Sequence, residues 1–115
     1  MEQLNRIELR GNVGSVRLQN FEGRSVANIY MATNFAYKDK NGNAVIETTW
    51  HNVTAWEGKN IQDVAGIKKG DMIQVWGRLR IQKYSTSDGT EREYPEVVAS
   101  RVTRINSDEG LTCEM

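Results

Sequence analysis

The alternating pattern of a β-strand is clearest in the stretch Arg78-Leu79-Arg80-Ile81-Gln82-Lys83-Tyr84. Successive side chains of a strand point to opposite faces of the sheet, so this stretch and the residues before it form two sets. One set is apolar and predicts a core face: Ile73, Val75, Leu79 and Ile81. The other combines rings with guanidinium groups and has no acid: Gln74, Trp76, Arg78, Arg80, Gln82 and Tyr84. Because unpaired charges are too costly to bury, we expect this second face at the surface, where such residues can stack bases and neutralise phosphates.

Length and composition indicate an ordinary globular domain. The 115 residues suffice for one hydrophobic core, and no apolar run approaches the ~18 residues of a membrane span. The amino-terminal residues lack an apolar signal core, so we expect a cytosolic protein. The single cysteine, Cys113, excludes an intrachain disulfide, and with one histidine in the chain we expect no metal and no cofactor.

The formal net charge is zero, which taken alone disfavours a nucleic-acid partner. However, residues 1–105 hold 15 basic and 12 acidic side chains, a net charge of +3, and the last ten residues contain only acids among their charged groups. The local clustering of charge sets the binding potential, so nucleic acid remains a possible partner.

The rest of the chain predicts five strands and one helix. The helix spans 59–69 and ends at Gly70, and glycines 11 and 14 indicate a bulge or bend in the first strand. Turns are expected at 20–24, at Asn41-Gly42 and at Ser87-Asp88-Gly89. The expected strands span 2–18, 25–36, 47–56, 71–85 and 92–105. An all-β chain with one short helix between its third and fourth strands has the element order of the OB-fold, a five-stranded Greek-key barrel. The hairpin of the last two strands is expected to project from this barrel.

Several segments, in register over roughly residues 4–105, resemble the bacterial single-stranded DNA-binding protein family (SSB). They are Asn5-Arg6-Ile7-Glu8-Leu9-Arg10-Gly11-Asn12-Val13-Gly14, Val26-Ala27-Asn28-Ile29-Tyr30-Met31-Ala32-Thr33, Thr49-Trp50-His51-Asn52-Val53, Lys69-Gly70-Asp71, Gly77-Arg78-Leu79-Arg80 and Tyr94-Pro95-Glu96-Val97-Val98. The resemblance implies a non-enzymatic protein that coats single-stranded DNA, without sequence preference, in replication, repair and recombination. It also implies a homotetramer in the bacterial cytoplasm, associated with the nucleoid.

The resemblance assigns base stacking to four aromatic positions: Tyr37, Trp50, Trp56 and Tyr84. It places His51 near a subunit contact. Members of the family usually end in an acidic tip that recruits replication and repair enzymes. This sequence ends at Cys113-Glu114-Met115, so the resemblance does not extend to that recruitment. We expect a DNA-binding domain at 1–105 and a short disordered acidic tail at 106–115.

Each aromatic residue also has a simpler structural interpretation. The Trp50 and Trp56 indoles could fill the barrel core, but Val53 and Ala55 on the opposite face can supply that core, which favours stacking. Tyr37 could pack on the barrel rim. Trp76 fits either the binding face or a contact between subunits, and the sequence does not decide between them.

The predicted phosphate contacts are Lys38, Lys40, Arg78, Arg80 and Lys83. Charges also commonly protect exposed edge strands, and the two roles are compatible. His51 has no second histidine or cysteine partner, so a structural role is expected rather than a catalytic one. No pair of carboxylates shares a strand face, so the sequence supports no acid–base chemistry and no enzyme. Two alternatives remain open: a primosome-type OB-fold accessory protein, and an OB-fold protein-interaction module that does not bind nucleic acid.

Overall fold

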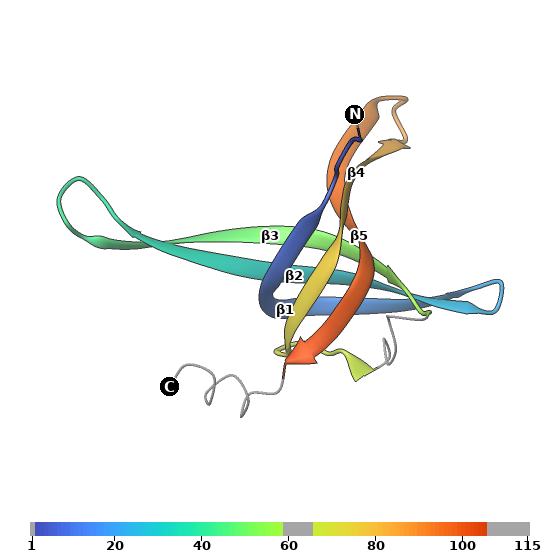
Figure 1. Cartoon of the computed structure of the whole chain (residues 1–115). Helices are drawn as coiled ribbons and strands as arrows, with labels where there is room; N and C mark the ends of the chain where they lie inside the picture. The colour runs from blue at the N-terminus through green and yellow to red at the C-terminus, as the bar shows by residue number, and fades with distance from the viewer. Residues whose placement is uncertain (1, 59–65, 106–115) are drawn as a thin grey trace.

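Five long strands close into a small barrel in the computed structural model, which describes residues 2–58 and 66–105 (Figure 1). The strands are β1 (Ile7–Phe21), β2 (Arg24–Lys38), β3 (Ala44–Trp56), β4 (Met72–Ser85) and β5 (Glu91–Ile105). Their order around the barrel is β1-β2-β3-β5-β4, with β4 returning to β1. The β3–β5 contact is parallel and the other pairings are antiparallel. This arrangement confirms the predicted OB-fold.

The first strand belongs to two strand pairs because it bends. Its first half, as far as Asn12, pairs with β4, and its second half, from Asn12 onward, pairs with β2. A β-bulge separates Val13 from Ser15, and a Cβ added to Gly11 would lie 2.0 Å from the carbonyl oxygen of Ala32. The two strands therefore approach more closely here than a side chain allows, which confirms the bend predicted from the glycines.

The barrel core is built from the inward positions of all five strands. Its fully buried large side chains are Ile29, Met31, Val53, Ile73 and Val75. Strand alternation predicted Val53 and Ala55 on one side and Ile73 and Val75 on another, and all four are buried. The predicted core role of Leu79 and Ile81 is wrong, because they are 43% and 47% exposed. At these positions β4 continues into the hairpin that projects beyond the barrel, so their inward face is only partly covered (Figure 1).

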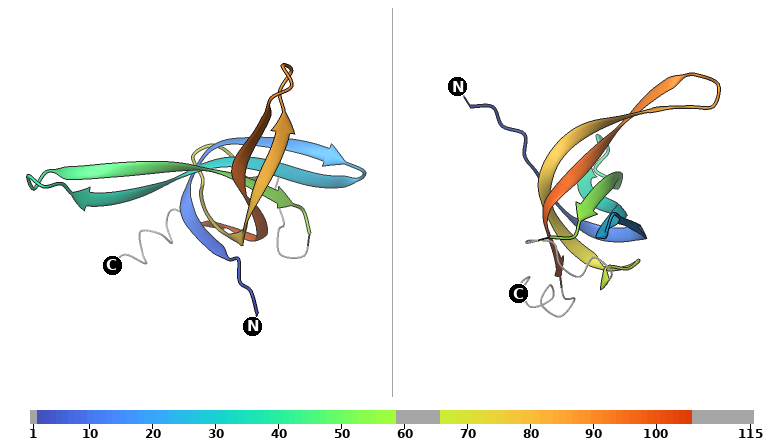
Figure 2. Two further views of the ribbon diagram at one scale, coloured as in Figure 1. Left: turned by 90° about the horizontal axis from the view of Figure 1, so that it is seen from above. Right: turned by 90° about the vertical axis from the view of Figure 1, so that its right-hand side faces the viewer.

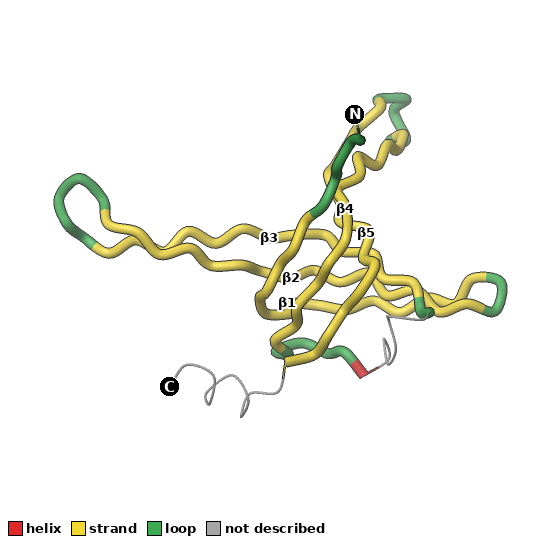
Figure 3. The backbone as a smooth tube through the Cα atoms, viewed as in Figure 1, coloured by secondary structure: helices red, strands yellow, loops and turns green. Residues whose placement is uncertain are grey.

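Three hairpins project from the barrel, whereas the sequence predicted only the one formed by β4 and β5 (Figures 1 and 2). The strands run past the barrel on both sides, and short loops close the tips (Figure 3). At the β1–β2 tip, Glu22 and Gly23 have φ of 50° and 81°. The β2–β3 tip spans 39–43, where Asp39 accepts hydrogen bonds from the backbone of Asn41 and Asn43. All three turns confirm the predicted positions: the first is shorter than expected, and the other two extend beyond the predicted residues, to 39–43 and 86–90.

The tip of the β4–β5 hairpin is ordered by one carboxylate. The Thr86 hydroxyl and the Thr90 backbone N–H donate hydrogen bonds to Asp88, and these bonds hold the pKa of Asp88 below its ordinary value. The ionised aspartate therefore fixes the loop at neutral pH.

Most of the predicted helix at 59–69, and the whole of the predicted tail at 106–115, lie outside the described residues. Of the predicted helix, residues 67–69 are not helical and lead into a turn at Gly70, while Ile67 packs into the barrel core. Within the described ranges, the chain forms no helix with the length and hydrophobicity needed to span a bilayer.

Candidate nucleic-acid interface

The outward face of β1, β2 and β3 forms one wall of an open groove, and the inner side of the β4–β5 hairpin forms the other. Trp50 and Trp56 lie on this outward face, in alternation with the buried residues Val53 and Ala55. Trp50 is 48% exposed and Trp56 is partly exposed. Neither indole fills the barrel core, so the simpler interpretation of these two residues is wrong.

Trp50 is held in a fixed orientation by its neighbours. Its indole stacks on the Tyr30 ring, with centroids 4.7 Å apart and planes inclined by 14°. A Cβ added to Gly14 would lie 2.6 Å from the edge of the same indole. The absence of a side chain at the bulge in β1 thus leaves room for the indole, and Tyr30 supports one of its faces.

Trp56 lies at the other end of the face, in a second aromatic cluster. The Phe21 ring meets it edge-on at 6.5 Å, and the Arg24 guanidinium lies 4.9 Å from its ring centre. On the opposite wall, Tyr84 and Tyr94 contact each other with centroids 5.8 Å apart. Trp56, Phe21 and Tyr94 all line the groove. Rings from both walls are therefore directed at one space.

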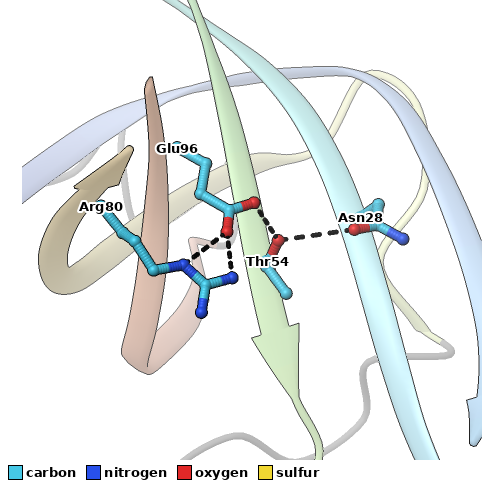
Figure 4. Close-up of polar contacts among 4 residues, drawn as sticks. All are labelled: Asn28, Thr54, Arg80 and Glu96. Atoms are coloured by element: carbon cyan, nitrogen blue, oxygen red, sulfur yellow. Dashed lines mark hydrogen bonds and ion pairs between the residues drawn. The ribbon is translucent and has the colours of Figure 1, made fainter. Parts of the chain in front are cut away.

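A polar chain crosses the floor of the groove from β4 to β2 (Figure 4). Arg80 donates from Nε to Glu96 Oε1 at 3.0 Å and also from Nη2 to the same oxygen. The Thr54 hydroxyl donates to Glu96 Oε2 at 2.9 Å and lies 3.4 Å from Asn28. Arg80 and Glu96 face each other in the register of β4 and β5. The face of β4 that carries Arg80 has no acidic residue of its own. The carboxylate beside Arg80 is supplied by Glu96 of the neighbouring strand, β5.

Comparison with known proteins identifies the family. Residues 4–105 match the Single-strand binding protein family. The chain belongs to this family. It is 35% identical, over 107 residues, to the single-stranded DNA-binding protein of Neisseria meningitidis serogroup B, covering 89% of this chain and 60% of that protein. It is 30% identical, over 112 residues, to single-stranded DNA-binding protein 1 of Chlorobaculum tepidum, covering 93% of this chain and 68% of that protein.

The fold of this SSB-family chain also matches solved structures. A structure described as the Plasmodium falciparum SSB complex with ssDNA aligns with a TM-score of 0.78 at 26% identity, covering 92% of this chain and 98% of that one. The chain spans less than two thirds of the length of its Neisseria relative, so the match concerns the barrel domain and its hairpins.

The structure divides the predicted SSB site residues between two hairpins. Arg78, Lys83 and Tyr84 lie on β4. Tyr37, Lys38 and Lys40 lie at or near the tip of the β2–β3 hairpin. Tyr37 was expected in a loop but lies within β2, beside Phe35 at 6.3 Å. Since Ala32 pairs with Trp50, Tyr37 points to the opposite face of that ribbon. All of these side chains are exposed, and their full list is Tyr37, Lys38, Lys40, Arg78, Lys83 and Tyr84.

The two residues predicted near subunit contacts lie outside the groove lining. His51 is partly buried, and its Nε2 lies 2.9 Å from the Thr33 hydroxyl. Burial lowers the pKa of this histidine. Trp76 is partly exposed, and the Arg101 guanidinium lies 4.8 Å from its ring centre. Among residues 2–58 and 66–105, no three His, Cys, Asp or Glu side chains are grouped so that they could bind a metal ion.

Among the residues of this candidate interface that the sequence prediction missed are Phe21, Tyr30, Tyr94 and Glu96. Alternation along the second strand puts Tyr30 on one face with Asn28, and this is the pattern that could have identified it. Glu96 could not be found this way, because its role depends on which residue of β4 lies opposite it.

Proposed function

We propose that this protein binds single-stranded DNA without sequence preference and coats exposed strands during replication, repair and recombination. The observation that carries the proposal is the outward placement of the Trp50 and Trp56 indoles on one face of β3, where Trp56 lines a groove with the Tyr94 ring on its far wall. Bases of any sequence have a flat face to stack on these rings, at roughly 1–3 kcal/mol per base. Duplex DNA keeps its bases paired, so it does not offer those faces.

The exposed cations supply the second part of the affinity. We assign phosphate contacts to Lys38 and Lys40 at one hairpin tip and to Arg78 and Lys83, which lie on opposite faces of β4; the exposure of all four side chains supports this assignment. If all four are engaged, the slope of log K against log salt is about −3 per subunit, so affinity falls about 50-fold between 50 and 200 mM salt. Arg80 differs from these four because Glu96 binds its guanidinium.

A fluorescence titration tests the proposal. Oligothymidine added to the protein is expected to quench tryptophan emission, with weaker binding at 200 mM salt than at 50 mM. The same strand annealed to its complement is the control and is expected to quench weakly. Absence of quenching, or equal affinity for the duplex, would exclude the proposed function.

We further propose that the protein is a homotetramer, with His51 and Trp76 near contacts between subunits, and that Tyr37 and Tyr84 provide two further stacking surfaces for bases, Tyr37 on the face of the β2–β3 ribbon opposite to Trp50. We place its action in the bacterial cytoplasm, at the nucleoid, and the bacterial origin of its relatives from Neisseria and Chlorobaculum supports the first part of this assignment, a bacterial protein. Several binding faces on one tetramer would let a long strand wrap around it. A mass measurement in solution tests the assembly directly.

Gly14→Ala is expected to weaken oligothymidine binding several-fold, up to about 10-fold, while the domain stays folded. The new methyl group displaces the edge of the Trp50 indole, which is the free end of a side chain, and the nearest backbone atom that it meets is the Tyr30 carbonyl oxygen, 3.3 Å away. The effect therefore cannot exceed the loss of one stacked base, roughly 1–3 kcal/mol. Gly58→Ala is the matched control, because its added Cβ would meet only one atom of the described part of the chain, the Trp56 carbonyl oxygen at 3.9 Å. Equal affinity of the two variants would contradict the proposed positioning of Trp50.

The stability of the protein is expected to fall between pH 7.5 and 5.5, in part because of His51. Burial lowers the pKa of its imidazole below the ordinary 6.5, so the unfolded chain takes up the proton more readily. The contribution of neutral His51 to the free energy of unfolding is therefore complete above about pH 6.5, and it is lost as the pH falls through the folded-state pKa. Melting temperatures of wild type and His51→Gln at the two pH values measure it. The melting temperature of His51→Gln should fall less between pH 7.5 and 5.5 than that of wild type. An identical fall in both proteins would refute the role given to His51.

A further inference from the structure

The floor of the groove is electrically neutral. Among the described residues that line it, within 2–58 and 66–105, only Arg80 and Glu96 are charged. The others are three rings, three side-chain amides, one hydroxyl and one aliphatic group: Phe21, Trp56, Tyr94, Gln19, Asn28, Gln82, Thr54 and Val26. A channel that follows phosphates requires excess positive charge, which this lining lacks. Its composition is that of a site for flat, uncharged groups with hydrogen-bonding edges.

Glu96 is the residue that removes the excess charge. Its side chain is only 5% exposed, and the pair it forms with Arg80 is the single ion pair recorded for residues 2–58 and 66–105. Both carboxylate oxygens are occupied, one by the guanidinium and the other by the Thr54 hydroxyl. The carboxylate is therefore fixed on the floor and cannot swing away when a ligand enters.

We infer that Glu96 is a specificity-determining residue: it binds Arg80, cancels its charge and makes the groove floor a site for bases rather than phosphates. The inference rests on the proposed function and assigns Arg80 a different role from the other cations. A phosphate that approached Arg80 would also approach the fixed carboxylate, and the repulsion would offset the attraction. A base carries no charge and is not repelled.

Arg80 retains the ability to recognise a base. A guanidinium has five N–H donors, and the two nitrogen atoms that bind Glu96 do not use all of them. The Arg80 side chain is 42% exposed, so the remaining donors are accessible to the carbonyl oxygen of a base. The bases thus enter the groove between the rings, while the sugar–phosphate backbone follows Lys38, Lys40, Arg78 and Lys83 outside it.

The salt dependence of binding separates the two roles, because the slope counts neutralised phosphates. We would measure oligothymidine binding between 50 and 200 mM salt for wild type, Glu96→Gln and the double variant Arg80→Gln/Glu96→Gln. The single variant frees Arg80 to reach a phosphate, so its slope should steepen by about 0.7, an extra loss of about threefold over this range. The double variant removes both charges and leaves no unpaired charge, so its slope should equal that of wild type.

The opposite pattern would overturn the inference. If Arg80 contacts a phosphate in the native protein, the double variant would be shallower than wild type by about 0.7 and Glu96→Gln would match wild type. Equal slopes in all three proteins would overturn the inference too, since removal of Glu96 would then not allow Arg80 to contact a phosphate. Where Glu96→Gln alone does not fold, wild type against the double variant still tests whether Arg80 contacts a phosphate in the native protein. A wild type that fails to bind oligothymidine at any salt concentration refutes the proposed function instead.

Discussion

Trp50→Ala is expected to weaken oligothymidine binding by roughly 5- to 150-fold, the equivalent of 1–3 kcal/mol for one stacked base. The indole is half exposed and is supported by Tyr30 on one face, so its removal deletes a stacking surface and leaves the barrel core unchanged. Trp56→Ala should have an effect near the lower end of this range, because Arg24 already lies over that ring. Quenching of the remaining tryptophans and fluorescence anisotropy of a labelled strand both measure the loss.

Leu18→Ala is the control for these two variants. Leu18 is as exposed as Trp50, but it alternates with the groove-facing side chains of β1 and lies on the opposite face of the β1–β2 ribbon. Its removal should leave affinity within about twofold of wild type. Affinities near wild type for both tryptophan variants, with folding intact, would show that the strand binds elsewhere.

Ile73→Ala is expected to lower the free energy of unfolding by about 2–5 kcal/mol. The Ile73 side chain is completely buried in β4, directly opposite the close contact at Gly11, so little can move to fill the space it leaves. A domain of this size is stable by only about 5–15 kcal/mol, so this is a large fraction of the total. Urea unfolding at one fixed protein concentration measures it and holds any contribution from subunit association constant.

The same substitution at Ile46 provides the comparison. Ile46 is largely exposed on the β2–β3 hairpin, so its truncation removes few contacts and should change the free energy of unfolding by less than about 0.5 kcal/mol. Similar losses at positions 46 and 73 would mean that the barrel interior does not hold the fold together as described.

Strand alternation was enough to predict the barrel and half of its site. It placed Val53 and Ala55 inside and the two indoles outside, because a period of two separates the faces wherever the sheet has a covered side. It failed for Leu79 and Ile81, which have the same pattern as Ile73 and Val75. Alternation along one strand does not indicate where the barrel ends and a free ribbon begins.

The polar half of the site depends on contacts between strands that are distant in sequence. Whether Glu96 meets Arg80 is set by the register of β4 against β5, which includes a bulge between Trp76 and Gly77. Register depends on the length of the turn and the position of bulges, and neither follows from local composition. Tyr30 is a different case, since its face was predictable, but its contact with Trp50 required the β2–β3 pairing.

The bend in β1 also has a consequence for how the chain folds. Its second half pairs with β2, which follows directly, but its first half must find β4, where Ile7 meets Gly77. The three hairpins can form locally, because their strands are neighbours in the sequence. The pairing of β1 with β4, here called the β1–β4 seam, must instead bring together residues that are distant in sequence, and pairing of this kind makes folding slow. Refolding is therefore expected on the millisecond-to-second scale. Amide protons along the β1–β4 seam should be the last to gain protection from exchange.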